Sequence, residues 1–243
     1  MHPRRLGLAS LLLAGLMTLT ALAQAAGRVP VSRPVPGQPR AIALGAAKAA
    51  AAECPLGVTG PAVLSIGYIA PPDDAYYTLI DPSECEDCDG AGVLVTSAHV
   101  VLDAWDIGPW PVRVGIVRAD LSDPECPAPI PGDYLSPPIQ LEISAPEFAV
   151  YDFTLALGQP VTLNQPAFLE ITFYEWGQWW TVPGLVTTGS CESCRSYNYY
   201  PGDDYDLCAF GFDGNPIMYV DAACASAVPT GRGSWGRLKS IYR

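Results

Sequence analysis

"AFLEITFYEW", residues 167–176, is the stretch that decides the fold. Leu169, Ile171 and Phe173 alternate with polar residues, so apolar and polar side chains point to opposite faces of an extended chain. A single apolar face of this kind must pack against a second layer of structure. The stretch therefore predicts a β-strand that turns these three side chains toward a core.

The same texture recurs in short β-rich runs separated by clusters of Pro, Gly, Asp and Asn, which favour turns. No helical period interrupts these runs. Such a pattern predicts an all-β domain over residues 56–226, a two-sheet antiparallel sandwich of the jelly-roll or Greek-key type. The expected strands cover residues 62–70, 92–104, 112–119, 139–144, 150–157, 167–176, 184–188 and 215–225.

The N-terminal residues have the pattern of a secretory signal peptide. A basic start precedes the apolar run 6–23, and small residues offer cleavage after Ala23 or Ala25. The alternative is an uncleaved membrane anchor. No later run approaches the roughly 20 apolar residues that span a bilayer. We therefore expect residues 1–25 to be removed, and the mature chain to be soluble and either secreted, periplasmic or at the cell surface.

Residues 26–55 read as a Pro- and Ala-rich linker. Four prolines in residues 26–40 and no periodic apolar pattern predict a disordered or extended segment. Residues 41–53 have high helix propensity but are too short to form a stable helix alone. We expect a disordered linker here, with a short, fraying helix as the only regular element.

Eight cysteines fit the predicted export, because an even number in an oxidising compartment indicates disulfides. Two Cys-x-x-Cys pairs also have the local spacing of zinc ligands, but they lie roughly 100 residues apart, which favours disulfides over a compact zinc site. The connectivity stays open at this point. The predicted disulfide cysteines are Cys54, Cys85, Cys88, Cys126, Cys191, Cys194, Cys208 and Cys224.

Charge is unevenly distributed along the chain. Residues 54–231 hold 24 acidic and three basic residues, a net charge of −21. A surface of this sign repels phosphate backbones, so nucleic acid is excluded as a partner. The same surface suits a soluble exported protein or one that binds cations.

His99, in "VTSAHVV", resembles the histidine motif of trypsin-like serine proteases, and Asp152, in "YDFTLAL", resembles their aspartate motif. The serine motif is broken, because "GFDGNP" (211–216) places Asp213 where the nucleophile belongs and Asn215 where a tight turn needs glycine. The alternatives are a degenerate protease-like fold and a strand histidine in or beside the core. The first predicts that His99, Asp152 and Asp213 converge.

Aromatic residues gather in two turn-like stretches, "FYEWGQWW" (173–180) and "SYNYYPGDDYD" (196–206). Exposed aromatic rings beside acids and amides can stack on sugar rings while polar groups bind their hydroxyls. The alternative is that some of these rings belong to the core, as we expect for Phe173. The predicted ligand-binding residues are Trp176, Trp179, Trp180, Tyr197, Tyr199 and Tyr200.

Acidic loops raise the question of calcium, which prefers oxygen ligands on loops. The candidate ligands form two clusters, and neither cluster matches a complete calcium-binding loop. The alternative is an acidic loop that faces solvent, and no other cofactor is expected. The candidate metal ligands are Asp87, Asp89, Asp203, Asp204 and Asp206.

The C-terminal tail, residues 227–243, is basic on an otherwise acidic chain, with Trp235 and Leu238 at helical spacing. One interpretation is a frayed end whose apolar face packs on the sandwich. The other is a tag that docks to an export or surface machinery.

Four motifs together resemble a group of uncharacterised secreted bacterial β-sandwich proteins over about residues 75–243. They are "SDPECPAP" (122–129), "CESCRSYNYY" (191–200), "GNPIMYVDAAC" (214–224) and the terminal "WGRLKSIYR" (235–243), beside the two Cys-x-x-Cys pairs. The resemblance implies an exported, disulfide-bonded sandwich with no known activity. We expect a non-enzymatic module that binds or displays something outside the cell, with a glycan or another cell-surface component as its partner.

Overall fold

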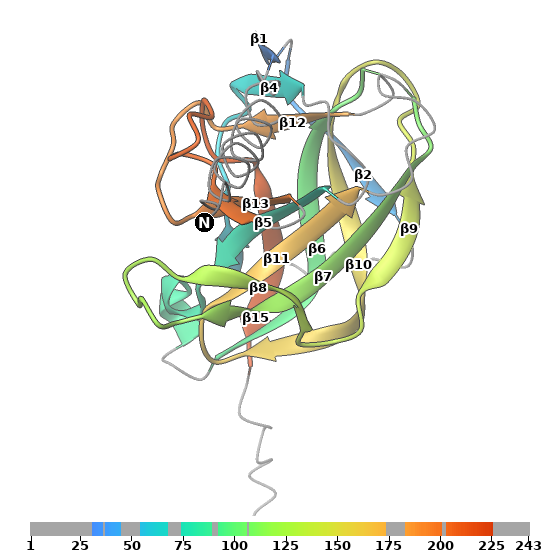
Figure 1. The fold of residues 1–243 in the computed structure, drawn as a ribbon. Helices are drawn as coiled ribbons and strands as arrows, with labels where there is room; N and C mark the ends of the chain where they lie inside the picture. Colours follow the sequence, from blue (N-terminus) through green and yellow to red (C-terminus); the bar gives the residue numbers. More distant parts are fainter. Residues whose placement is uncertain are drawn as a thin grey trace, which may run out of the picture.

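The structure is a computed structural model that describes residues 31–35, 37–44, 54–67, 74–88, 92–105, 107–173, 183–200 and 203–225. Two curled sheets, sheet A and sheet B, stack on one another (Figure 1). Sheet A contains β1 (Val31–Pro34), β2 (Arg40–Leu44), β3 (Cys54–Gly57), β4 (Leu64–Gly67), β6 (Val93–Asp103), β10 (Val150–Leu163), β12 (Gly184–Thr187) and β15 (Met218–Cys224). Sheet B contains β5 (Asp74–Ile80), β7 (Trp110–Asp120), β8 (Ala128–Tyr134), β9 (Ile139–Ile143), β11 (Ala167–Phe173), β13 (Ser196–Tyr200) and β14 (Asp203–Asp206).

The chain passes repeatedly from one sheet to the other. In sheet A the strand order is β1-β4-β12-β6-β10-β2, and β15 joins β6 to β3. In sheet B the order is β14-β13-β5-β11-β7-β8, with β9 also on β7. Consecutive strands such as β4, β5, β6 and β7 alternate between the sheets, as in a sandwich rather than a meander. The predicted two-sheet sandwich is confirmed.

The core lies between the sheets and follows the alternation expected from the sequence. Leu169, Ile171 and Phe173 of β11 are buried in it, as predicted. They meet the inward side chains of sheet A, among them Val100 and Phe153. Burying these apolar side chains on both inner faces is what holds the two layers together.

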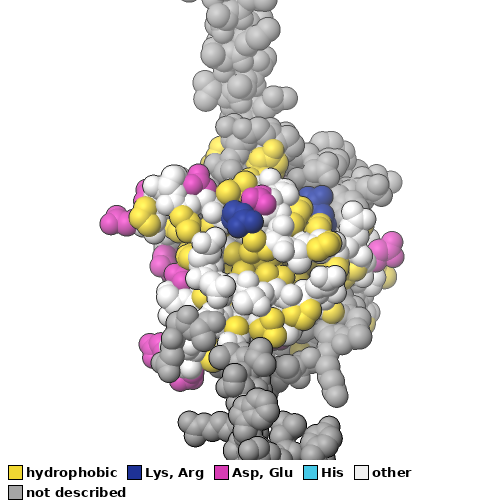
Figure 2. Space-filling model, turned by 90° about the horizontal axis from the view of Figure 1, so that it is seen from below, with side chains coloured by type: hydrophobic (Ala, Val, Ile, Leu, Met, Phe, Trp, Pro, Cys, Tyr) yellow, Lys and Arg dark blue, Asp and Glu magenta, His cyan; other side chains and the backbone are white. Residues whose placement is uncertain are grey.

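Each sheet also has an outer face that is partly covered. A small apolar cluster lies on the outer face of sheet A, and Val35 packs against it. Its members are Val101, Val150, Val186 and Ile217. On sheet B, Phe168 and Tyr197 belong to a second cluster and meet edge to face, with ring centroids 5.6 Å apart. Acidic side chains lie around the rim of the face seen in Figure 2, and basic ones cover only small areas of it.

A buried acid lies on the outer face of sheet B. Glu170, at the centre of β11, is 1% exposed. One of its oxygens, Oε1, accepts hydrogen bonds from Arg113 Nε at 3.1 Å, Tyr134 Oη at 2.6 Å and Thr172 Oγ1 at 2.7 Å. Three donors around Oε1 offset part of the loss of hydration that burial imposes on the carboxylate, whose other oxygen, Oε2, is buried without a hydrogen-bond partner.

All eight expected strand regions contain a strand, but the N-terminal region differs from expectation. Residues 31–44, expected in the linker, form β1 and β2 in sheet A. Here backbone pairing to β4 and β10 gives order to a segment that has no apolar periodicity of its own. The expected signal peptide, most of the expected helix (residues 45–53) and the C-terminal tail lie outside the described residues.

All eight cysteines form disulfides, as predicted. The pairs are Cys54–Cys85, Cys88–Cys224, Cys126–Cys194 and Cys191–Cys208. Each Cys-x-x-Cys motif is therefore split between two bridges, and the motifs do not combine into one zinc site. Four bridges fit a protein that folds in an oxidising compartment.

Candidate functional site

His99 lies near the middle of sheet A, on the central strand β6. Its backbone is paired with Thr154 of β10 on one side and with Tyr219 of β15 on the other. Ala98 and Val100, its chain neighbours, point into the core, so His99 points to the outer face. The residue is nevertheless only 9% exposed.

Two carboxylates flank the imidazole ring of His99. Nδ1 lies 3.1 Å from Asp152 Oδ1, and Nε2 lies 3.0 Å from Asp221 Oδ2. Asp152 is on β10 and Asp221 is on β15, so the three side chains come from three adjacent strands. Both ring nitrogens can donate only when the histidine is protonated, so this arrangement favours the imidazolium.

Hydroxyl groups extend this network at both ends. Ser97 Oγ donates to Asp221 Oδ2, and Tyr219 Oη donates to Asp152 Oδ2 at 2.6 Å. The Tyr219 ring also stacks on the His99 ring, with centroids 4.3 Å apart and planes 8° from parallel. A cation over an aromatic face is stabilised further by the ring quadrupole.

The pKa values follow from these contacts. Burial alone would lower the pKa of His99, but hydrogen bonds and charge attraction from Asp152 and Asp221 raise it to about 9. Burial raises the pKa of Asp221, but hydrogen bonds from His99 and Ser97 bring it below its usual value. Burial, together with Asp152, raises the pKa of Tyr219. At neutral pH His99 is therefore held as a cation between the carboxyl groups of Asp152 and Asp221.

The site agrees with the protease-like alternative in one respect and differs from it in two. His99 and Asp152 are adjacent, as the protease-like alternative predicts, but Asp213 is exposed in the loop before β15. The group that faces Nε2 is Asp221, and Ser97 Oγ donates to that carboxylate rather than to the histidine. A general base needs a free nitrogen lone pair near its nucleophile, and a protonated His99 between two acids offers none.

A second feature is a cavity of about 410 Å³ between the loop after β3 and the β12–β13 loop. Two of its polar lining residues, Arg195 and Asn215, are held in place by contacts within the protein. Arg195 forms an ion pair with Glu84 and donates from Nη2 to Gly57 O at 3.1 Å. Asn215 accepts from Glu192 N at 2.6 Å and donates back to Glu192 O at 3.1 Å. The polar lining residues are Thr59, Thr188, Ser190, Glu192, Arg195 and Asn215.

The predicted aromatic ligand residues separate into different environments. Tyr197 is 6% exposed, and its hydroxyl donates to Pro127 O at 2.9 Å, so it packs on sheet B instead of forming a binding surface. Tyr199 is half-buried beside the same cluster. Trp176, Trp179 and Trp180 and the side chain of Tyr200 lie outside the described residues.

The predicted calcium ligands are also distributed unevenly. Asp87 is exposed in the short 3₁₀ helix η2 (Glu86–Cys88). Asp206 uses both carboxylate oxygens to accept from Cys194 N and Cys208 N, each at 2.9 Å, so it braces the disulfide loops. Asp89 and the side chains of Asp203 and Asp204 lie outside the described residues.

Sequence reasoning missed Asp221 and Tyr219, although a signal for them was present. In "IMYVDAAC" (217–224), these two polar residues alternate with Met218, Val220 and Ala222, which are buried. That alternation places both polar side chains on the face opposite the core, where His99 also points. The sequence alone does not show that β15 pairs with β6.

Comparison with known proteins finds no relative. The chain matches no known protein-family model, no curated protein and no solved structure at a significant level.

None of the described residues forms a helix long and apolar enough to cross a membrane.

Proposed function

We propose that the protein is an exported, non-enzymatic binding module and that its ligand is a carbohydrate. The observation that carries the proposal is the braced polar cavity beside β3. Its volume of about 410 Å³ falls within the range of roughly 300–1,000 Å³ usual for ligand pockets. Hydroxyl, amide, carboxylate and guanidinium groups around one cavity match the alternating donors and acceptors of a sugar better than they match an apolar ligand.

The rigidity of the lining supports this proposal. Arg195 and Asn215 are already held by Glu84 and by the Glu192 backbone, so binding would order few additional side chains. Preformed polar sites lose less conformational entropy when a ligand binds. The predicted export, the four disulfides and the acidic surface agree with a ligand that is neutral and lies outside the cell.

A glycan array with the purified, disulfide-intact protein tests the proposal. We expect binding to a discrete set of glycans, reduced at least about tenfold by T59V/S190A, which removes two cavity hydroxyls while nearly keeping their volume; this corresponds to about 1.4 kcal/mol. An alanine triple variant of Trp176, Trp179 and Trp180 tests the aromatic stretch separately. Phe148→Ala, a change at a 72% exposed side chain, is the control. Absence of glycan binding, or equal binding by all variants, would overturn the proposal.

A degenerate protease-like fold is the second candidate, because His99 Nδ1 lies 3.1 Å from Asp152 Oδ1. It leads to a separate prediction. A fluorophosphonate probe, which labels activated serines, should leave Ser97 unlabelled, because the Ser97 hydroxyl donates to Asp221 and not to a basic nitrogen. An active trypsin-like protease provides the positive control. Labelling of Ser97 that disappears in the His99→Gln variant would show that a hydrolytic site exists after all.

A further inference from the structure

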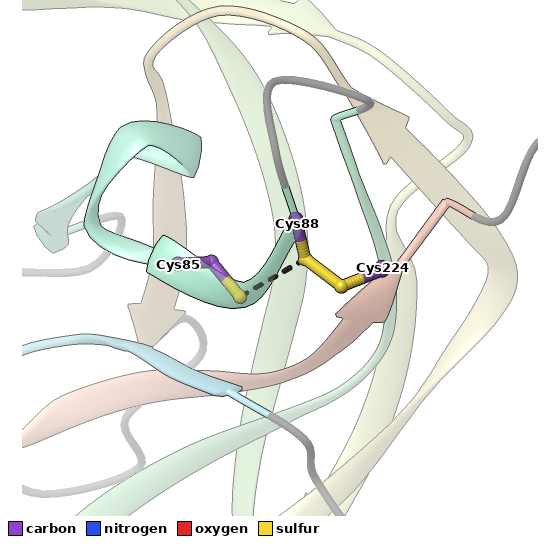
Figure 3. A group of neighbouring side chains, drawn as sticks. All are labelled: Cys85, Cys88 and Cys224. Atoms are coloured by element: carbon purple, nitrogen blue, oxygen red, sulfur yellow. Dashed lines mark hydrogen bonds between the residues drawn. A yellow bond between two sulfur atoms is a disulfide. The ribbon is translucent and has the colours of Figure 1, made fainter.

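Four of the eight cysteines meet where β3, β15 and the two 3₁₀ helices η1 (Pro82–Glu84) and η2 come together. Cys54 of β3 is bonded to Cys85, and Cys224 of β15 is bonded to Cys88. Cys85 Sγ and Cys88 Sγ, which belong to different disulfides, lie only 3.1 Å apart (Figure 3). The two bridges therefore touch through their inner sulfur atoms.

The residues that carry the inner sulfur atoms are more buried than those that carry the outer ones. Cys85 and Cys88 are 5% and 4% exposed, whereas Cys54 and Cys224 are half-buried. A thiol that approaches from solvent therefore reaches Cys54 or Cys224 first. Attack on Cys54 breaks the Cys54–Cys85 bond and leaves the thiolate on Cys85. Attack on Cys224 breaks the Cys88–Cys224 bond and leaves the thiolate on Cys88. In both cases the thiolate lies directly beside the remaining disulfide.

We propose that these four cysteines form a thiol–disulfide exchange site whose substrate is an external dithiol. In the first step a dithiol thiolate bonds to Cys54 Sγ, and the Cys54–Cys85 bond breaks with its electron pair on Cys85. The Cys85 thiolate then bonds to Cys88 Sγ, 3.1 Å away, and expels the Cys224 thiolate. The second dithiol sulfur closes on the first and releases Cys54. The dithiol is oxidised by two electrons, and its two protons end on Cys54 and Cys224.

Entry at Cys224 leads to the same product. The attacked bond then leaves its electron pair on Cys88, which bonds to Cys85 and expels Cys54. Both routes replace two bridges with a single Cys85–Cys88 disulfide, the pairing within a Cys-x-x-Cys motif that redox-active proteins use. The exchange removes the covalent links from β3 and β15 to the η1–η2 segment while those strands keep their backbone pairing to one another.

The second group of cysteines provides an internal control. Cys191-x-x-Cys194 has the same spacing, and its members are likewise split between two disulfides. Among the eight described cysteines, only Cys85, Cys88 and Cys224 bring three sulfur atoms within 4.8 Å of one another. Cys191 and Cys194 therefore belong to no comparable cluster of sulfur atoms.

Limited reduction of the native, disulfide-intact protein with dithiothreitol, acid quenching, alkylation and peptide mapping tests the proposal. In chains with two free thiols at this end, we expect the alkyl groups on Cys54 and Cys224, together with an intact Cys85–Cys88 disulfide. In the second group we expect alkylated native pairs, either Cys126 with Cys194 or Cys191 with Cys208. Alkylation of Cys54 with Cys85, or of Cys88 with Cys224, would overturn the proposal, because it means that each bridge opens alone.

Two double variants isolate the exchange step. C88S/C224S removes the second bridge, so reduction should now free Cys54 and Cys85. C191S/C208S, the matched control, should leave the Cys54 and Cys224 pattern unchanged. If either variant fails to fold, the peptide map of the unchanged protein still decides, because its three product patterns differ in mass and position. This inference is independent of the proposed carbohydrate ligand.

Discussion

Raising the pH from 7 to 10 should lower the free energy of unfolding by roughly 2 kcal/mol through His99 alone, after allowance for partial solvent screening. The pKa of His99 is raised from 6.5 to about 9 in the folded protein. Its contribution to stability is therefore fully present below pH 6.5 and disappears as the pH rises through 9. Above that pH a neutral ring can donate to only one of the two carboxylates, and the other faces a lone pair.

Guanidinium unfolding at pH 7 and pH 10, with the disulfides intact, measures this loss. His99→Gln is the control, because it keeps a polar side chain but removes the titration, and its stability should change much less over the same range. Equal losses in both proteins would show that other groups cause the effect. On the acid side, the lowered pKa of Asp221 contributes stability above pH 3.8 that is lost as the pH falls through its folded value.

Arg113→Met should lower the free energy of unfolding by up to about 3 kcal/mol, the low end of the range typical of a buried ion pair, because Glu170 is buried but the Arg113 side chain is 32% exposed. Glu170 is 1% exposed, and Arg113 is its only cationic partner among the contacts of Oε1. Without the guanidinium, the hydroxyls of Tyr134 and Thr172 alone must support a buried negative charge. Denaturant titration at pH 7 measures the change.

Two further variants test whether the loss of stability comes from leaving the Glu170 carboxylate without its ion-pair partner. R113M/E170L replaces both charges with apolar side chains and should recover most of the lost stability, because no buried charge is left without a partner. Arg118→Met, at a surface pair with Asp133, is the matched control and should change stability by at most about 1 kcal/mol. If R113M and R118M were equally mild, the Arg113–Glu170 pair would not stabilise the fold.

The sandwich was predictable because its central strands alternate in the simplest way. In β11, every second residue from Leu169 is apolar and buried, and the pattern is independent of what the strand pairs with. β6 was equally clear, since its β-branched residues favour an extended chain. A strand with an apolar inner face and a polar outer face carries its own signal in the sequence, even where, as in β11, both faces are buried.

Other strands lack such a signal. β8 includes Pro129, Pro131 and Gly132, which favour loops, and it is ordered by pairing at the edge of sheet B. β13 and β14 are acidic and rich in tyrosine, and they form a hairpin that completes the other edge. β5 carries apolar or aromatic residues on both of its faces, so Asp74–Ile80 shows no clear alternation. In each case tertiary pairing, and not local pattern, determines the conformation.

The candidate site was half predictable for the same reason. His99 and Asp152 could be named from their motifs, and they do meet. Asp221 could not be selected from the 25 acidic residues of the chain without knowledge that β15 pairs with β6. The disulfide map needed the same knowledge, because eight cysteines allow about 105 pairings.

The two N-terminal strands have a consequence for solubility. β1 and β2 are joined by only residues 35–39, yet they occupy opposite ends of the β1-β4-β12-β6-β10-β2 order of sheet A. One short segment thus covers two edges of the sheet, the free sides of β4 and β10. Its loss would uncover two rows of unpaired amide and carbonyl groups at once, and such rows template pairing between molecules. The segment expected to be a linker thus covers strand edges that would otherwise be open to pairing between molecules.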